Sequence, residues 1–238
     1  MSDIKLIAMD LDGTLTQHKT PLTHEARAAL DALDKKYRLV MAGAGMARRI
    51  FSQMGQYPID IVGNYGMQWG LYNETTRQID IVRDEILPFD RELIISRIDE
   101  LREIYGYTDY AGDTAEFHSS GCVTFPLLGT KADPAQKLSF DPDRKKRRAF
   151  YGEVVKAFPE YNVFVGGSSS FDMAPKPFDK YYALSQYCAE RNIDRKNVLY
   201  IGDDYGLGGN DEPVYRSDIP FLTIDDYRDF PRLVQPLL

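Results

Sequence analysis

The sequence has little cysteine, no long apolar run and no excess of basic residues, and each of these scarcities excludes a class of protein. The only two cysteines, Cys122 and Cys188, form no CxxC pair, which argues against a disulfide scaffold or a zinc ribbon. No apolar run approaches the roughly 18 residues of a membrane span. The first five residues lack the basic start and apolar stretch of a signal peptide. We therefore expect a cytoplasmic protein with no membrane partner.

The charge balance favours a small-molecule ligand. There are 29 basic and 36 acidic residues, so the net charge is −7 and a polyanion is repelled. We accordingly expect no nucleic-acid partner, and we interpret the basic run Arg144–Arg148 as the outer face of a helix rather than as a nucleic-acid patch. With 43% hydrophobic residues, a chain of 238 residues can bury a substantial core without a structural metal.

The order of expected elements predicts an α/β core sheet interrupted by an α+β insertion. Nearly continuous apolar strands alternate with helices near both ends of the chain, which is typical of a parallel sheet covered on both faces. These strands are expected at residues 4–10, 39–42, 59–62, 198–201 and 219–224. The middle of the chain instead predicts a helix ending at Gly106, a strand at 122–128, a helix from about 141 to 158, and strands at 161–165 and 170–174. We predict a core formed by residues 1–83 and 175–238, with an inserted domain at 84–174.

Acidic residues follow two of the predicted core strands. Asp10 and Asp12 end the first strand, and Asp203 and Asp204 end a later one. Ligands of open parallel sheets bind at the carboxyl ends of the strands, so these side chains are expected to lie together. Carboxylates gathered in one place repel one another unless a cation joins them, and ligands made only of oxygen favour a hard ion such as Mg²⁺.

The segment Asp10-Leu11-Asp12-Gly13-Thr14-Leu15-Thr16 resembles the first motif of the haloacid dehalogenase superfamily of phosphotransferases. The resemblance implies that Asp10 is the nucleophile, that Asp12 is the general acid and base, and that Mg²⁺ is the cofactor. Elementary electrostatics also favours a metal cofactor. A carboxylate that approaches a phosphoryl group is repelled by about 4 kcal/mol for two unit charges at 4 Å and an effective dielectric constant near 20. A divalent ion between them removes that barrier.

The later motifs of the superfamily are matched in part. The second normally offers a Ser or Thr hydroxyl to the phosphate, but here the strand is followed by Gly43, Ala44 and Gly45. Their backbone amides are candidates for phosphate binding, and the alternative is a tight turn without a ligand role. The third motif is a lysine, which the resemblance places at Lys180, with Lys176 as competitor.

The fourth motif corresponds to Gly202-Asp203-Asp204 and Gly208-Gly209-Asn210-Asp211. The resemblance implies that Asp203 is a direct metal ligand, with the other metal or phosphate ligands drawn from Asp10, Asp12, Asn210 and Asp211.

The insertion lies between the second and third motifs, as in subfamily IIB, whose cap is an α/β module. Within that branch the chain resembles the eukaryotic-type phosphomannomutases, and the match of Ser170-Phe171-Asp172-Met173 adds Ser170 and Asp172 as substrate-binding candidates. Those mutases carry two cap arginines where this sequence has Ser119 and Thr130. Without these two arginines, each of which can bind a phosphate through two hydrogen bonds, a second phosphate is bound more weakly. Lys131 compensates for this loss only in part.

We therefore expect a magnesium-dependent phosphatase of a small phosphorylated metabolite, such as a sugar phosphate, acting through an aspartyl phosphate. Two alternatives stay open: a sugar-phosphate mutase similar to phosphomannomutase, and a catalytically silent metabolite-binding protein on the same scaffold. Since the related mutases associate through their caps, a homodimer through the cap is a further expectation.

Overall fold

The computed structural model describes residues 3–238, which divide into two compact units. The core unit contains the residues up to Glu85 together with Asp179–Gly206 and Asp211–Leu238, and the cap unit contains Ile86–Phe178 and Leu207–Asn210. Residues 1 and 2, part of the stretch considered for a signal peptide, lie outside the described residues. Among the described residues, no helix has the length and apolar character needed to cross a membrane.

The core unit is built on a seven-stranded sheet in the order β11-β10-β1-β2-β3-β4-β5. The five strands from β11 to β3 pair in parallel, whereas β4 and β5 form an antiparallel hairpin at one edge. The predicted parallel core is confirmed for the strands β11, β10, β1, β2 and β3. The hairpin of β4 and β5 was not predicted. The strands are β1 (Leu6–Met9), β2 (Arg38–Ala42), β3 (Asp60–Gly63), β4 (Gln68–Asn73), β5 (Gln78–Asp84), β10 (Val198–Gly202) and β11 (Phe221–Thr223).

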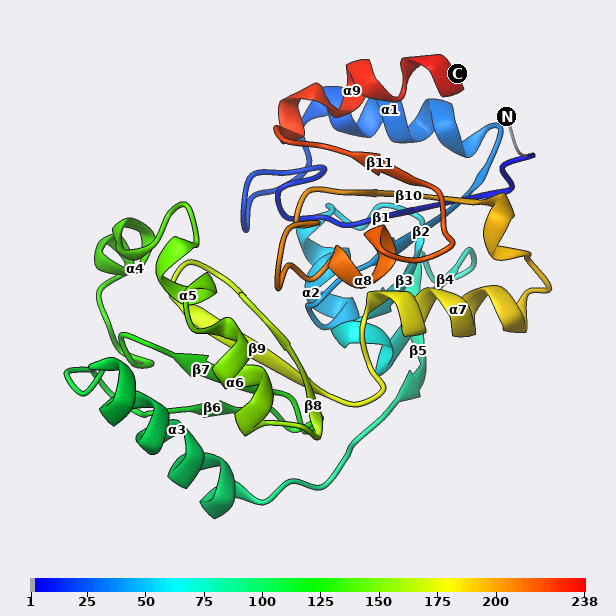
Figure 1. The fold of residues 1–238 in the computed structure, drawn as a ribbon. Coiled ribbons are helices and arrows are strands. Elements are labelled where there is room, and N and C mark those ends of the chain that lie inside the picture. Colours follow the sequence, from blue (N-terminus) through cyan, green and yellow to red (C-terminus); the bar gives the residue numbers. More distant parts are fainter. Residues whose placement is uncertain (1–2) are drawn as a thin grey trace. The chain divides into compact units, whose positions relative to one another are not determined.

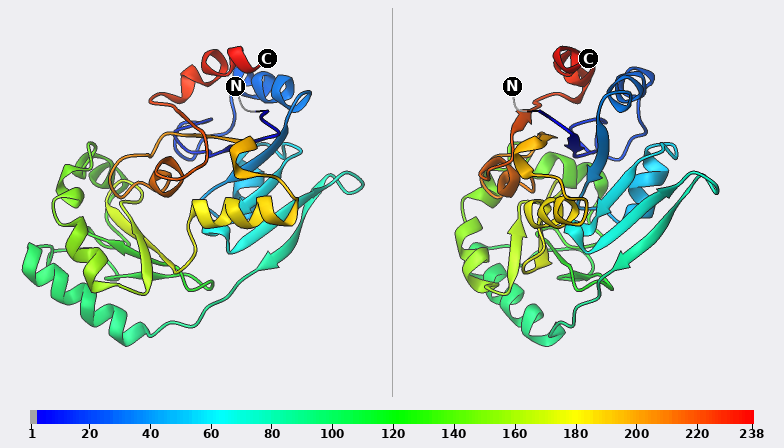
Figure 2. Two further views of the ribbon diagram at one scale, coloured as in Figure 1. Left: turned by 45° about the vertical axis from the view of Figure 1, so that its right-hand side comes forward. Right: turned by 90° about the vertical axis from the view of Figure 1, so that its right-hand side faces the viewer.

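Helices cover both faces of this sheet (Figures 1 and 2). Alternate residues of β1 serve the two faces: Ile7 and Met9 pack against α1, α2 and α9, whereas Leu6 and Ala8 pack with α7 and α8. Burial on both faces explains why the strands are almost uniformly apolar. The helices are α1 (His24–Asp34), α2 (Ala47–Gln53), α7 (Lys180–Glu190), α8 (Glu212–Tyr215) and α9 (Phe230–Leu233), with short 3₁₀ turns η1 (Asn64–Gly66), η2 (Arg195–Asn197), η3 (Tyr227–Asp229) and η4 (Gln235–Leu237).

The cap unit has its own antiparallel sheet, in the order β6-β7-β9-β8, and its own apolar core. The expected α+β module is therefore present, although the helix expected over residues 141–158 is divided into two and α4 was not predicted. The elements are α3 (Arg91–Tyr105), β6 (Glu116–Phe117), β7 (Val123–Pro126), α4 (Pro134–Phe140), α5 (Lys145–Arg148), α6 (Tyr151–Ala157), β8 (Tyr161–Phe164) and β9 (Ser170–Pro175).

The interpretation of the basic run Arg144–Arg148 as an outer helix face is wrong for Arg147. The Arg147 side chain is 1% exposed, and its Nε donates a 2.9 Å hydrogen bond to Asp141 Oδ2. The same guanidinium donates to three carbonyl groups of loop 166–170. Arg147 is therefore a structural anchor of the cap unit, because its buried guanidinium donates to several carbonyls between β8 and the start of β9.

Candidate active site

Three aspartates of the core unit meet at the carboxyl ends of two neighbouring strands. Asp10 follows β1 and Asp203 follows β10, and these strands pair in parallel, so their ends share one edge of the sheet. Asp211 joins them from the N-cap position of α8. One carboxylate oxygen from each of the three residues lies within 4.8 Å of the others. Sequence reasoning predicted that all three would contribute to the site.

Lys180 lies among these carboxylates. Its side chain is 1% exposed, and Nζ lies 3.0 Å from Asp10 Oδ1 and 2.6 Å from Asp211 Oδ1. It is the first residue of α7, which begins there because the Asp179 carboxylate accepts a hydrogen bond from the backbone N–H of Tyr182. Its competitor Lys176 is exposed and belongs to the cap unit, where Nζ donates to the carbonyl of Pro159. The geometry favours Lys180.

Asp211 organises the site through four accepted hydrogen bonds. Its Oδ1 accepts from Lys180 and, at 2.5 Å, from the hydroxyl of Tyr200. Its Oδ2 accepts from the backbone N–H groups of Asp203 and Asp204, at 3.1 and 2.9 Å. A carboxylate offers about four lone-pair positions, so direct metal ligation by Asp211 would require one of these bonds to be exchanged. Sequence reasoning missed Tyr200, whose only signal was a hydroxyl within an otherwise apolar strand.

The first motif also holds Asp203 in place. Thr14 Oγ1 donates a 2.9 Å hydrogen bond to Asp203 Oδ1. Gly13 has φ of +96°, and a Cβ atom there would lie 2.3 Å from Asp203 Oδ2. Glycine is therefore required at this position for its backbone conformation and for the close approach of the carboxylate.

Electrostatics shows that the site is short of positive charge. Burial raises the pKa of Asp10 to about 8; Lys180 opposes this shift, whereas Asp211 and Asp203 add to it. Burial and then Asp211 raise the pKa of Asp203 to about 6. Three carboxylates thus share one ammonium group. The donor set is all oxygen, so these residues fit a hard divalent cation, which would also favour their ionised forms.

The loop Gly43–Gly45 lies beside Asp10, because a Cβ atom at Gly43 would be 3.9 Å from Asp10 Oδ1. The loop is held by two residues in the left-handed region, Asn64 (φ +49°) and Tyr65 (φ +57°). The backbone N–H of Tyr65 donates to the carbonyl of Gly43, and that of Asn64 donates to the carbonyl of Gly45.

This pairing decides where the next amides point. In a planar trans peptide the N–H is directed opposite to the C=O. Since the carbonyls of Gly43 and Gly45 face the turn at residues 64 and 65, the N–H groups of Ala44 and Met46 point away from it. The orientation is consistent with the predicted binding of a phosphate by backbone amides.

Asp12 lies outside the group of three aspartates. Its Oδ1 accepts hydrogen bonds from the backbone N–H of Lys19 and from Nε2 of Gln53, both at 2.7 Å. Its assignments as general acid and base and as metal ligand stay predictions, and Gln53 is a second residue that sequence reasoning missed.

The remaining predicted residues belong to the cap unit. Lys131 is exposed, Ser170 donates to the carbonyl of Gly166, and Asp172 accepts a 3.0 Å hydrogen bond from Thr124. Burial raises the pKa of Asp172. Asn210 lies in the segment 207–210, which is counted with the cap unit. Substrate or metal binding by these residues stays a prediction.

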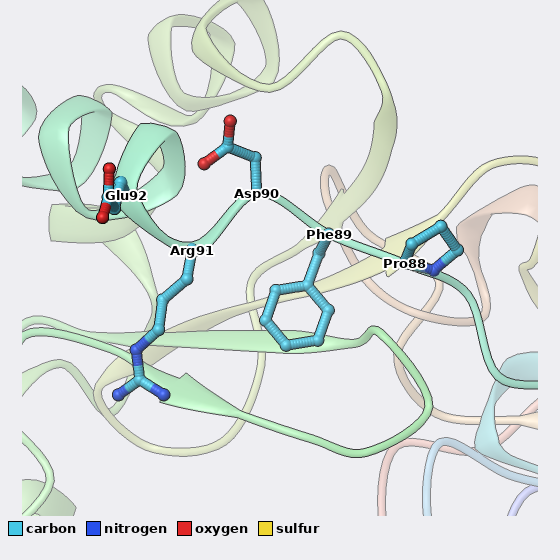
Figure 3. A pocket seen from close by; sticks show the side chains of 5 residues that line it. All are labelled: Pro88, Phe89, Asp90, Arg91 and Glu92. Atoms are coloured by element: carbon cyan, nitrogen blue, oxygen red, sulfur yellow. The ribbon is translucent and has the colours of Figure 1, made fainter.

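A surface pocket of the cap unit is lined by five consecutive residues at the start of α3, Pro88–Glu92. Figure 3 shows the side chains of Phe89 and Arg91 on one side of the chain and that of Asp90 on the other. The Asp90 carboxylate caps α3 by accepting from the N–H of Leu93. The pocket contains none of the predicted site residues.

Comparisons with known proteins agree with this geometry. A family profile described as haloacid dehalogenase-like hydrolase matches residues 93–211, which is half of the chain. The chain belongs to the haloacid dehalogenase-like hydrolase family. It is thus an enzyme of the phosphatase and phosphotransferase type.

Several curated relatives of this hydrolase are named as phosphomannomutases. The phosphomannomutase of Saccharomyces cerevisiae is 26% identical, with 88% of this chain and 84% of the yeast protein covered. A probable phosphomannomutase of Caenorhabditis elegans is 24% identical, with 90% and 87% covered.

Solved structures share the fold. A subclass IIB sugar phosphatase of the superfamily superposes with a TM-score of 0.61 at 13% identity, covering 96% of this chain and 91% of that chain. The IMP-nucleotidase of Plasmodium falciparum superposes with a TM-score of 0.65 at 15% identity, covering 98% and 67%. The predicted fold class, a core sheet with an inserted cap, is confirmed by these likenesses.

Proposed function

We propose that this hydrolase is a magnesium-dependent phosphatase that releases phosphate from a sugar phosphate through an aspartyl phosphate on Asp10. The observation that carries the proposal is the position of Lys180, buried between Asp10 and Asp211 and beside Asp203. A buried ammonium there neutralises the nucleophile and the incoming phosphate together, as phosphoryl transfer requires. The names of the relatives and structural neighbours support a sugar phosphate as the substrate class.

In the first step an oxygen of Asp10 forms a bond with phosphorus, and the ester P–O bond breaks. The electron pair goes to the leaving oxygen, which takes a proton from Asp12 and departs as an alcohol. In the second step a water oxygen attacks phosphorus and gives its proton to Asp12. The bond from phosphorus to Asp10 then breaks, which yields inorganic phosphate and restores the carboxylate.

Asp10 and Asp203 are the residues that would hold the cation. When bound, Mg²⁺ supplies charge neutralisation between the phosphate and the nucleophile. Lys180 holds its hydrogen bonds to Asp10 and Asp211, and Asp12 carries the proton. In the loop Gly43–Gly45 the N–H of Gly43 is taken by the carbonyl of Val62, so the amides that follow it are the ones that bind phosphate oxygens.

The second candidate, a sugar-phosphate mutase, is favoured by the phosphomannomutase relatives. The cap argues for the phosphatase instead. Thr130 stands where those mutases are expected to have an arginine, and its hydroxyl pairs with the backbone N–H and carboxylate of Asp113. A hydroxyl committed to a loop contact does not supply a bidentate phosphate clamp.

The experiment is incubation with Mg²⁺ and a panel of sugar monophosphates, following both phosphate release and the exchange of 1- and 6-phosphates. Phosphate release that is abolished in Asp10→Asn supports the phosphatase. Exchange stimulated by a sugar bisphosphate would show a mutase. Intact Mg²⁺ binding without turnover on the panel would favour the silent metabolite-binding protein.

A further inference from the structure

Asp12 is held by a side chain from α2 rather than by the other acidic residues of the site. The Nε2 group of Gln53, the last residue of that helix, donates a 2.7 Å hydrogen bond to Asp12 Oδ1. The backbone N–H of Lys19 donates to the same oxygen at 2.7 Å. Two N–H donors on one oxygen fix the rotation of the carboxylate as well as its position.

The contacts of Gln53 also fix the orientation of its amide. Nε2 donates to the carbonyl of Thr20 at 3.0 Å and lies 3.3 Å from Thr16 Oγ1. Its carbonyl oxygen accepts a 2.7 Å hydrogen bond from Arg49. A flipped amide would direct its oxygen at the Asp12 carboxylate and the Thr20 carbonyl, and its NH₂ at a guanidinium, so only one orientation satisfies these partners.

The second oxygen of Asp12, Oδ2, has only longer contacts. Arg49 Nη1 lies 3.6 Å from Oδ2 and His18 Nδ1 lies 3.9 Å from it, both beyond hydrogen-bond distance. The hydrogen bonds from Lys19 and Gln53 both end on Oδ1, so Oδ2 takes part only in these longer contacts among those given for residues 3–238. The Asp12 side chain is 18% exposed, so this oxygen is accessible to a ligand.

We propose that Gln53 is a positioning residue that holds Asp12 by Oδ1 and presents Oδ2 to the leaving oxygen of the substrate, with Arg49 orienting the Gln53 amide. This inference rests on the proposed function, in which Asp12 protonates that oxygen. Gln53 itself touches no reacting atom. Its effect is therefore confined to the part of the rate that depends on proton donation.

The test compares leaving groups. An alkyl phosphate releases a strongly basic alkoxide and needs a proton donor, whereas p-nitrophenyl phosphate releases a weakly basic phenolate and needs it far less. The first step is measured in a single turnover, as release of the alcohol or phenol, for the wild type and three variants. Gln53→Met keeps the side-chain volume without a donor, Gln53→Glu places a carboxylate against Asp12, and Asp12→Ala removes the acid.

We expect both Gln53 variants to slow the alkyl reaction by about 10- to 100-fold, as a misplaced catalytic group does. The aryl reaction should slow by less than about threefold, with KM unchanged for both substrates. Asp12→Ala should show the same pattern with a larger loss. Gln56→Glu is the matched control, since it adds the same charge at an exposed position three residues away and should leave both rates unchanged.

The outcomes separate this inference from the proposed function. If Asp12→Ala discriminates between the two leaving groups and the Gln53 variants do not, the role of Gln53 is wrong and that of Asp12 stands. Equal losses on both substrates in the Gln53 variants, with a lower melting temperature, would show a structural role and overturn the inference. If Asp12→Ala slows both reactions equally, the proposed role of Asp12 itself fails.

Discussion

The core and cap units each bury a basic side chain against a carboxylate, and the balance of charge around the two side chains differs. In the cap, Arg147 pairs with the single carboxylate of Asp141, and its remaining donors go to backbone carbonyls. In the core, Lys180 is shared by Asp10 and Asp211, with Asp203 close by.

This difference in charge balance distinguishes a structural ion pair from a candidate functional site. A buried pair with matched charges and filled hydrogen bonds fixes a loop and has nothing left for a ligand. A buried cluster with excess negative charge favours binding of a cation, and its raised pKa values mark a candidate functional site. The following predictions test whether the two buried basic residues differ in this way.

The largest expected effect is on the stability of the cap. Arg147→Met should lower the free energy of unfolding by about 3–5 kcal/mol, because it leaves the buried Asp141 charge without its partner. Urea denaturation measures the loss, and hydrogen exchange of loop 166–170 locates it. Lys145→Met, which removes a surface pair with Asp143, is the control and should be indistinguishable from the wild type. Equal stability of the two variants would contradict the anchoring role of Arg147.

Lys180→Met should lower the rate of phosphate release, whereas Arg147→Met lowers the stability of the fold. We expect kcat for phosphate release to fall by about 100- to 1,000-fold, as when a preorganised electrostatic donor is lost from an active site. Phosphate release from the best sugar phosphate of the panel is the measurement. Lys176→Met, the competitor from the sequence, should keep the full rate. A loss confined to Lys176→Met would reverse the assignment.

The two units should also respond oppositely to pH. The pKa of Asp10 is raised from 3.8 to about 8 and that of Asp203 from 3.8 to about 6, so the folded protein binds protons more readily than the unfolded chain. Stability contributed by protonation of these groups is present below pH 4 and is lost as the pH rises towards 8.

The pKa of Asp141 in the cap unit is shifted in the opposite direction. Burial alone would raise its pKa, but hydrogen bonds from Arg147 and two backbone N–H groups outweigh this and lower it. Its stabilisation is therefore present above pH 3.8 and is lost as the pH falls through the folded value. Urea denaturation in EDTA between pH 3 and 8 checks both signs, with Asp10→Asn and Asp141→Asn as the matched variants. The dependence of the free energy of unfolding on pH should become weaker in both variants: at the alkaline end of this pH range for Asp10→Asn and at the acid end for Asp141→Asn. The same change in both variants would contradict the difference proposed between the two units.

What could be predicted from the sequence was local. Asp10, Asp203 and Lys180 could be proposed as site residues because each stands at a strand end or a helix start, in a motif of a few consecutive residues. The partners of these residues come from distant parts of the chain. Thr14 and Asp203 are 189 residues apart, and Gln53 and Asp12 are 41 apart. No local spacing specifies such pairs, so the fold has to be known first.

The elements that were missed have identifiable causes. Strand β5 has the sequence QIDIVRD, in which Ile79 and Ile81 alternate with polar residues, the pattern of a half-buried strand. Helix α4 begins at Asp133-Pro134, with the Asp133 carboxylate as its cap. The expected helix over residues 141–158 is interrupted at two residues whose backbone is not helical: Arg144 has φ of +59°, and Phe150 has φ of −126°.

The smallest expected effect concerns two loops that are held differently. A side chain, Arg147, holds the cap loop 166–170, whereas backbone groups hold the core loop Gly43–Gly45. The core loop lacks the hydroxyl of its family motif, so Ala44→Ser should add one hydrogen bond to a bound phosphate, worth about 0.5–1.5 kcal/mol.

The inhibition constant of inorganic phosphate should therefore fall by about 2- to 10-fold in Ala44→Ser, with kcat little changed. Ala44→Cys is the control, because it adds an atom of similar placement with much weaker hydrogen bonding. If Ala44→Ser leaves phosphate affinity unchanged, the loop does not face the phosphate, and the inference drawn from the orientation of its amides is wrong. The anchoring of the cap loop by Arg147 would be unaffected, since the two loops depend on separate contacts.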